Sequence, residues 1–218
     1  MRFFMNNVII FGDSYSTFKG FIPEGNEPYY YPGGFSNGVE KNDVENMTDT
    51  WWGQLIAEKG YNLLLNDSWS GSTIGYTGYN NVDCSETSSF ICRFNKLKDN
   101  GFFKENKLDT VFVFGGTNDA WCGAPIGELK YADWSKEDLY SVLPAVCYFF
   151  KILTDELKDC KIVSIVNTEL NETITQGIIT ASKHYGITPV MLEDIDKLTG
   201  HPTLAGMTSI KEQVAKVL

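Results

Sequence analysis

The sequence predicts a three-layer α/β/α sandwich built around a parallel sheet. Short apolar runs, rich in β-branched or aromatic residues, alternate along the chain with longer segments whose apolar residues recur at helical spacing. The 218 residues also suffice for one large domain with a sizeable core. Because strand–helix–strand units connect by right-handed crossovers, this alternation favours parallel strands with helices on both faces.

Five runs have the length and composition of buried strands. The first is Val-Ile-Ile-Phe, closed by Gly12, which is typical of a strand covered on both faces. The predicted strands span residues 8–11, 61–65, 110–114, 161–166 and 187–192.

Five segments have helical periodicity. The clearest spans residues 135–157, where Ser135 and Asp138 have the spacing of a helix-capping pair. Pro144 lies inside this segment, and we expect it to kink the helix. The predicted helices span residues 51–59, 88–98, 135–157, 174–185 and 204–218.

Residues 18–47 form a long connection, rich in Gly, Pro and Asn, between the first strand and the first helix. Loops of this length are usually functional or disordered. Three consecutive tyrosines at 29–31 favour an ordered loop, because aromatic side chains need a surface to pack on. The sequence shows no repeat and no linker, so residues 1–218 are predicted to form a single domain with a loop insertion at about 18–47.

The charge balance narrows the range of partners. A formal net charge of −10 disfavours nucleic acid and anionic membrane surfaces, and suits a neutral or cationic small-molecule or carbohydrate substrate. No apolar run is long enough to span a bilayer, and the N-terminal residues lack the pattern of a signal peptide. We therefore expect a cytoplasmic protein, and the sequence leaves its oligomeric state open.

The cysteines and histidines limit which covalent cross-links, metal sites and catalytic groups the sequence indicates. The five cysteines are an odd number without a CxxC pair, which favours reduced thiols over a disulfide framework or a zinc site. His184 and His201 are the two histidines, so chemistry that needs an imidazole has two candidates. His184 precedes Gly186 at the expected end of a helix, where a structural role is the simpler interpretation.

Polar, Gly-rich turns follow four of the predicted strands and contain Ser14, Gly71, Asn118 and His201. Because the carboxyl ends of parallel strands meet at one edge of a sheet, these residues are expected to converge. Each alone is readily explained as a turn or capping residue. Together they suit acyl transfer, which needs a nucleophile, a base, and amide donors for the oxyanion.

Four blocks, FGDSYS, SWSGST, GGTND and GHPTLAGM, resemble those of the GDSL or SGNH hydrolase family in order and spacing, from residue 8 to about residue 210. The resemblance implies a flavodoxin-like fold with strand order 2-1-3-4-5, and a lipase-like serine esterase that works through an acyl-enzyme. It also implies Ser14 as the nucleophile, His201 as the base, and an oxyanion hole formed by the amides of Ser14 and Gly71 and the side chain of Asn118.

The sequence departs from the family pattern at the third catalytic position. Family members usually carry an Asp three residues before the His, where this chain has Leu198. The nearest acids are Asp196 and Asp194, and a backbone carbonyl near Leu198 or Thr199 could orient the imidazole instead. The choice between Asp196, Asp194 and a carbonyl stays open at this stage.

Trp69 and Trp121 are expected near the rim of the site, as a possible substrate pocket. Aromatic faces beside a polar catalytic edge suit sugar rings or apolar acyl groups, although large aromatic side chains more often pack in the core. We therefore predict an O-acetyl esterase for carbohydrate or small-molecule esters. The alternatives are a lysophospholipase or thioesterase-type acyl hydrolase, and a non-catalytic flavodoxin-like ligand-binding module. No metal or other cofactor is expected, because an oxyanion hole supplies the electrostatic stabilisation.

Overall fold

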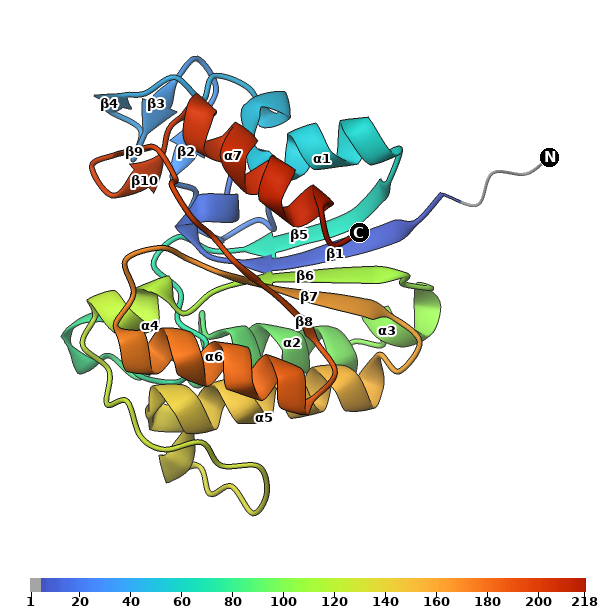
Figure 1. Cartoon of the computed structure of the whole chain (residues 1–218), viewed down its shortest axis with the longest axis vertical. Coiled ribbons are helices and arrows are strands. Elements are labelled where there is room, and N and C mark those ends of the chain that lie inside the picture. Colours follow the sequence, from blue (N-terminus) through green and yellow to red (C-terminus); the bar gives the residue numbers. More distant parts are fainter. Residues whose placement is uncertain (1–4) are drawn as a thin grey trace.

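The computed structural model describes residues 5–218, which fold around a five-stranded parallel sheet (Figure 1). The strands of this sheet are β1 (Asn7–Gly12), β5 (Asn62–Ser68), β6 (Thr110–Phe114), β7 (Lys161–Val166) and β8 (Thr188–Met191). They lie side by side in the order β5-β1-β6-β7-β8. When only these five strands are counted in chain order, the sheet has the strand order 2-1-3-4-5, so the predicted fold class is confirmed.

Helices cover both faces of the sheet (Figure 1). Helices α1 (Trp51–Lys59) and α7 (Leu204–Ala215) pack on one face. The other face carries α2 (Phe90–Asp99), α5 (Val142–Glu156) and α6 (Glu172–His184). Two short helices, α3 (Phe102–Glu105) and α4 (Thr117–Trp121), flank β6 in the sequence. Among residues 5–218, no helix has both the length and the apolar character needed to cross a bilayer.

The central strand β1 shows why the layers form. Its side chains alternate between the two faces, with Ile9 and Phe11 in one core and Val8 and Ile10 in the other. All four are fully buried. A strand that is apolar on both faces is stable only with helices on both sides, as the sequence indicates.

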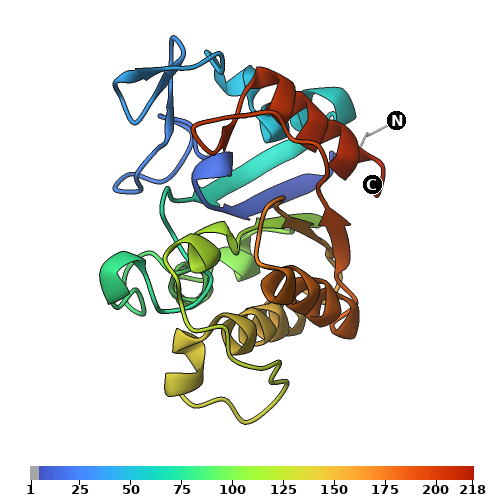
Figure 2. The ribbon, with the colours of Figure 1, turned by 60° about the vertical axis from the view of Figure 1, so that its left-hand side comes forward.

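The long connection after β1 contains a small antiparallel sheet of three strands, β2 (Tyr30–Tyr31), β3 (Phe35–Ser36) and β4 (Glu40–Lys41). This sheet lies beside a hairpin formed by β9 (Lys197–Leu198) and β10 (His201–Pro202), as both views show (Figure 1 and Figure 2). The loop residues Tyr29 and Tyr30 are buried there. Aromatic packing therefore ties the long connection to the C-terminal part of the chain.

The predicted helix at residues 135–157 is wrong as one continuous element. A short 3-10 helix, Glu137–Tyr140, is followed by extended backbone at Ser141 (φ −109°, ψ 143°), and α5 begins only at Val142. Pro144 consequently lies in the first turn of α5, where a helix needs no N–H from that residue. The proline therefore favours a new helix start over a kink in a longer helix.

A buried ion pair lies beneath the carboxyl ends of β1 and β5. Arg93 of α2 is only 4% exposed, and its Nη1 lies 3.2 Å from Oδ2 of Asp67. Its Nη2 donates to the carbonyl of Gly12 at 3.2 Å and to the hydroxyl of Ser72 at 3.2 Å, and its Nε donates to the carbonyl of Ser88 at 2.9 Å. One cation thus joins α2 to the carboxyl ends of two neighbouring strands, β1 and the edge strand β5.

Replacing Arg93 should destabilise the fold strongly, because the carboxylate of Asp67 would stay buried without its counter-ion. Arg93→Met is expected to lower the free energy of unfolding by about 3–5 kcal/mol in urea titrations at pH 7. The matched control is Lys151→Met, which removes an exposed ion pair with Asp155 and should cost no more than about 0.5 kcal/mol. Equal losses in the two variants would contradict a structural role for the buried pair.

Candidate active site

Ser14 begins a one-turn 3-10 helix, Ser14–Ser16, directly after β1. The carboxylate of Asp13 caps this turn by accepting a hydrogen bond from the backbone amide of Tyr15 at 3.0 Å. Gly12 has no room for a side chain, because a Cβ there would lie 2.4 Å from the hydroxyl of Ser68. The chain can therefore turn sharply out of the strand, and Ser14 lies at the edge of the sheet where the other loops emerge.

His201 lies in β10, and its Nε2 is 2.9 Å from Oγ of Ser14. Its Nδ1 is 3.4 Å from the backbone carbonyl of Thr199. Burial lowers the pKa of His201 to about 4; the contact with Thr199 opposes this shift, and the positive charge of Lys197 adds to it. The imidazole is therefore neutral near pH 7, with one nitrogen able to accept a proton from the Ser14 hydroxyl.

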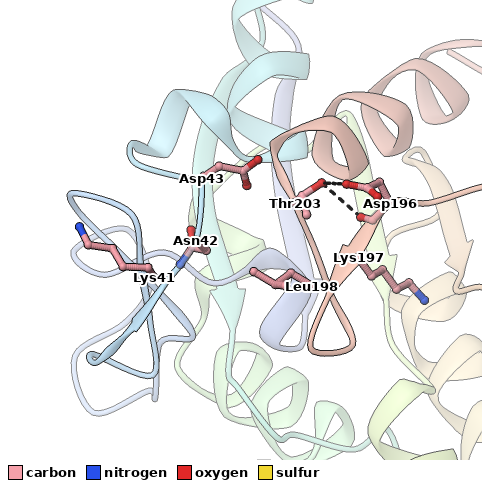
Figure 3. A pocket seen from close by; sticks show the side chains of 7 residues that line it. All are labelled: Lys41, Asn42, Asp43, Asp196, Lys197, Leu198 and Thr203. Atoms are coloured by element: carbon pink, nitrogen blue, oxygen red, sulfur yellow. Dashed lines mark hydrogen bonds between the residues drawn. The ribbon is translucent and has the colours of Figure 1, made fainter.

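The structure does not bring Asp196 to the imidazole. The carboxylate of Asp196 accepts a hydrogen bond from the hydroxyl of Thr203, and its backbone carbonyl accepts one from the Thr203 amide at 3.1 Å. Its side chain points toward Thr203 at the wall of an open hollow of about 440 Å³ between β4 and the β9–β10 hairpin (Figure 3). Asp194, the other acid considered, lines a separate surface hollow with residues of α7.

Two tyrosine hydroxyls hold the backbone on either side of His201. Tyr15 donates to the carbonyl of Gly200 at 2.5 Å, and Tyr30 donates to the carbonyl of Pro202 at 2.7 Å. Both phenols are largely buried, and burial raises the pKa of each well above its ordinary value. They therefore remain protonated donors at neutral pH.

The turn of the β9–β10 hairpin is strained. Its two residues, Thr199 and Gly200, both have left-handed backbone angles, with φ of 50° and 82°. Glycine adopts this region freely, but a β-branched residue such as threonine rarely does. Strand β9 of this hairpin is also anchored, because Nζ of Lys197 lies 2.6 Å from the hydroxyl of Thr168. Strain of this kind persists only where the surrounding contacts impose it.

Three aromatic side chains surround the imidazole of His201. The ring of Tyr29 stacks on it, with centroids 3.6 Å apart and an interplanar angle of 11°. Tyr15 and Trp121 approach with centroids 5.3 Å and 5.8 Å away. The sequence analysis singled out Trp121 but neither Tyr15 nor Tyr29. For Tyr29, the run of three tyrosines at 29–31 was a signal that these aromatic rings pack on a surface.

Gly71 lies on the loop after β5, and Asn118 lies in the first turn of α4, directly after β6, so both are at the same edge of the sheet. Gly71 has φ of 79°, and no atom lies within 4 Å of the position of a Cβ there. The amide of Ser72 bonds to the carbonyl of Trp69 at 3.1 Å, whereas the amides of Ser14 and Gly71 have no hydrogen-bond partner within residues 5–218. Nδ2 of Asn118 donates to the carbonyl of Ser72 at 3.0 Å, so the side-chain amide of Asn118 lies beside the turn that contains Gly71.

Asp119 fixes the loop that follows Gly71. Its fully buried carboxylate accepts hydrogen bonds from the amides of Ile74 at 2.9 Å and Gly75 at 3.1 Å. Burial raises the pKa of Asp119 to about 6, and these hydrogen bonds oppose the shift. Burial also raises the pKa of Asp13, to about 7. Both carboxylates accept hydrogen bonds from backbone amides, and they thereby hold the turn after β1 and the loop after Gly71 in place.

The other predicted residues lie outside this arrangement or at its rim. Trp69 is half-buried, and its amide donates to the carbonyl of Gly12 at 3.1 Å. Trp121 is 43% exposed, so its ring is accessible beside His201. His184, the last residue of α6, stacks on Tyr131 with centroids 4.0 Å apart.

Comparisons with known proteins find solved structures that are similar to this chain. A protein from Bacteroides ovatus, assigned to the GDSL-like lipases, is 39% identical; the match covers 98% of this chain and 97% of that one, with a TM-score of 0.88. A second such protein, from Bacteroides uniformis, is 42% identical over 98% and 95% of the two chains, with a TM-score of 0.89. An acetyl xylan esterase from Butyrivibrio proteoclasticus shares the fold at 15% identity, covering 100% of this chain and 64% of that one, with a TM-score of 0.59.

No curated protein matches the chain. The GDSL-like lipase/acylhydrolase family, in contrast, matches residues 6–218, almost the full sequence. The four sequence blocks, the sheet order and the two similar Bacteroides structures all lead to the same family. The chain therefore belongs to the GDSL-like lipase/acylhydrolase family and is an ester-hydrolysing enzyme.

Proposed function

We propose that the enzyme is a serine O-acetyl esterase for carbohydrate or small-molecule esters, in which Ser14 attacks the ester carbonyl and His201 takes the serine proton. The observation that carries this proposal is the 2.9 Å distance between Nε2 of His201 and Oγ of Ser14. A serine hydroxyl is a weak nucleophile without an adjacent base. Because burial keeps the imidazole uncharged, it can act as that base at neutral pH.

The reaction then proceeds through a covalent acyl-enzyme. Attack by Oγ of Ser14 places negative charge on the former carbonyl oxygen, which the amides of Ser14 and Gly71 and one N–H of Asn118 stabilise. Both backbone amides lack another partner within residues 5–218, which favours this role. His201 next donates its proton to the departing alcohol. Water, activated by the same imidazole, releases the acid and restores Ser14.

The proposal assigns the orientation of the imidazole to neutral groups. The carbonyl of Thr199 accepts from Nδ1 of His201, so that Nε2 is left to accept the serine proton. The stacked ring of Tyr29 restrains the plane of the imidazole. A carbonyl stabilises the transient imidazolium less than a carboxylate does, which affects the rate and leaves the class of reaction unchanged.

The substrate proposal rests on the rim of the site and on charge. The exposed ring of Trp121 stands beside His201, and aromatic faces of this kind bind sugar rings. The net charge of −10 disfavours anionic phospholipid surfaces. An acetyl xylan esterase shares this fold, which makes acetylated xylan the first natural ester to test.

Loss of either reacting side chain should abolish turnover. Ser14→Ala and His201→Ala are each expected to reduce kcat for p-nitrophenyl acetate by about 10³-fold or more, with acetate preferred over longer acyl chains in the parent enzyme. His184→Gln, which alters the other histidine, should retain parental activity. Undiminished turnover in the Ser14 variant would exclude the acyl-enzyme route, and a preference for long chains would favour a lysophospholipase or thioesterase type.

Two substitutions separate a carboxylate from neutral groups as the orienting partner. Asp196→Asn should change kcat by less than about 2-fold, whereas Tyr29→Leu, which removes the stacked ring, should lower it about 3- to 10-fold. Tyr29→Phe keeps the ring and should remain near the parent. A large loss of kcat in the Asp196 variant, with unchanged thermal stability, would instead make that carboxylate the third catalytic member.

The pH dependence should report the shifted imidazole. His201 acts only when neutral, so kcat/KM should fall as the pH decreases through about 4 and reach a plateau above it. An unperturbed histidine would place this acid limb near pH 6.5. The measurement is kcat/KM in brief assays across the acid range, with recovery at pH 7 to exclude unfolding. An acid limb at the unperturbed value would contradict a buried, neutral base.

A further inference from the structure

The amide group of Asn118 is held from both ends. Its Nδ2 donates to the carbonyl of Ser72 at 3.0 Å, and its Oδ1 accepts from the hydroxyl of Tyr79 at 2.9 Å. A backbone carbonyl can only accept, so the nitrogen must face Ser72 and the oxygen must face Tyr79. One N–H of the amide remains for another acceptor.

Tyr79 is presented by a turn with an unusual backbone. The next two residues, Asn80 and Asn81, have left-handed φ values of 56° and 58°. Asparagine tolerates this region better than most residues, but the conformation still carries strain. The turn is closed by a backbone bridge between Thr77 and Asp83. A strained turn that its surroundings impose is typical of a segment that aims a functional side chain.

The Tyr79 hydroxyl also stays protonated, so it can always donate its hydrogen bond to Asn118. Burial raises the pKa of the phenol to about 12, so it keeps its proton throughout the range in which an imidazole base works. A hydrogen bond accepted by Oδ1 of Asn118 draws electron density from the amide, and this makes the remaining N–H a stronger donor. It also prevents a rotation that would present Oδ1 to a negative charge.

We propose that Tyr79 is a positioning residue for ester hydrolysis, whose hydroxyl holds the Asn118 side chain with its N–H directed to the developing oxyanion. The inference rests on the proposed function, because it takes Asn118 as a member of the oxyanion hole. Tyr79 is 41% exposed, so the competing role is a direct contact between its ring and the substrate. The two roles differ in the kinetic constant that they change.

The first test is Tyr79→Phe, which removes the hydroxyl and keeps the ring. An oxyanion contact exists only in the transition state, so kcat for p-nitrophenyl acetate should fall about 3- to 10-fold while KM stays within about 2-fold. Tyr140→Phe is the matched control, because the Tyr140 hydroxyl donates to Asp83 of the same turn at 2.8 Å. It should leave kcat unchanged, whereas equal losses in both variants would mean a loosened turn and overturn the proposal.

The second test is a double-mutant cycle with Asn118→Ala, which alone should lower kcat by about 10²- to 10³-fold. In that background Tyr79→Phe should change kcat by less than about 2-fold, because no amide remains to be oriented. The same loss in both backgrounds, or a raised KM, would assign Tyr79 to the substrate and overturn the proposal. No loss in the parent background would overturn it as well.

Failure of the inference and failure of the proposed function give different results. If Asn118→Ala leaves kcat unchanged, the oxyanion role and the inference for Tyr79 are both wrong, while Ser14→Ala still tests the serine mechanism independently. If Asn118→Ala is impaired and Tyr79→Phe is not, only the inference is wrong. Titration of active sites with an organophosphate ester, together with thermal unfolding midpoints, ensures that each kcat refers to folded enzyme.

Discussion

The guanidinium of Arg93 is a buried cation that is stable only with its partners in place, and two of those partners lie at the carboxyl ends of β1 and β5. Asp67 compensates its charge, and the carbonyl of Gly12 accepts one of its hydrogen bonds. Its contact with the hydroxyl of Ser72 extends the network, since the carbonyl of Ser72 accepts from Asn118. Because an unpaired buried charge is costly, the ends of β1 and β5 cannot separate without large loss of stability.

A different principle holds the His201 side of the site. Most of the contacts here are neutral. The hydroxyls of Tyr15 and of Tyr30 in the long connection bond to the backbone of the β9–β10 hairpin, and the ring of Tyr29 stacks on the imidazole. Desolvation by these aromatic rings also explains the lowered pKa of the imidazole. The same packing therefore orients the imidazole of His201, the proposed base, and keeps it uncharged. The long connection after β1 is thus part of the candidate site.

The two sides meet at Ser14, whose turn is short because Gly12 permits close packing and Asp13 caps it. The buried acids Asp13 and Asp119 accept hydrogen bonds from backbone amides. Lys197 bonds to Thr168 and Glu169, and its charge contributes to the lowered pKa of His201. A site made of amides, carbonyls and one neutral imidazole is suited to a substrate whose charge appears only in the transition state. A neutral ester is such a substrate.

Local patterns in the sequence determined the five sheet strands, most of the helices and the four blocks that indicate the family, because periodicity and turn chemistry depend on neighbouring residues. They failed for the segment around Pro144, where one helix became two. Only the tertiary structure showed that Thr199 faces the imidazole while Asp196 bonds to Thr203, and that Tyr79 reaches Asn118 across 39 positions. These hydrogen-bond partners depend on how distant segments pack and on the angle of one hairpin. The spacing of residues along the sequence does not contain that information.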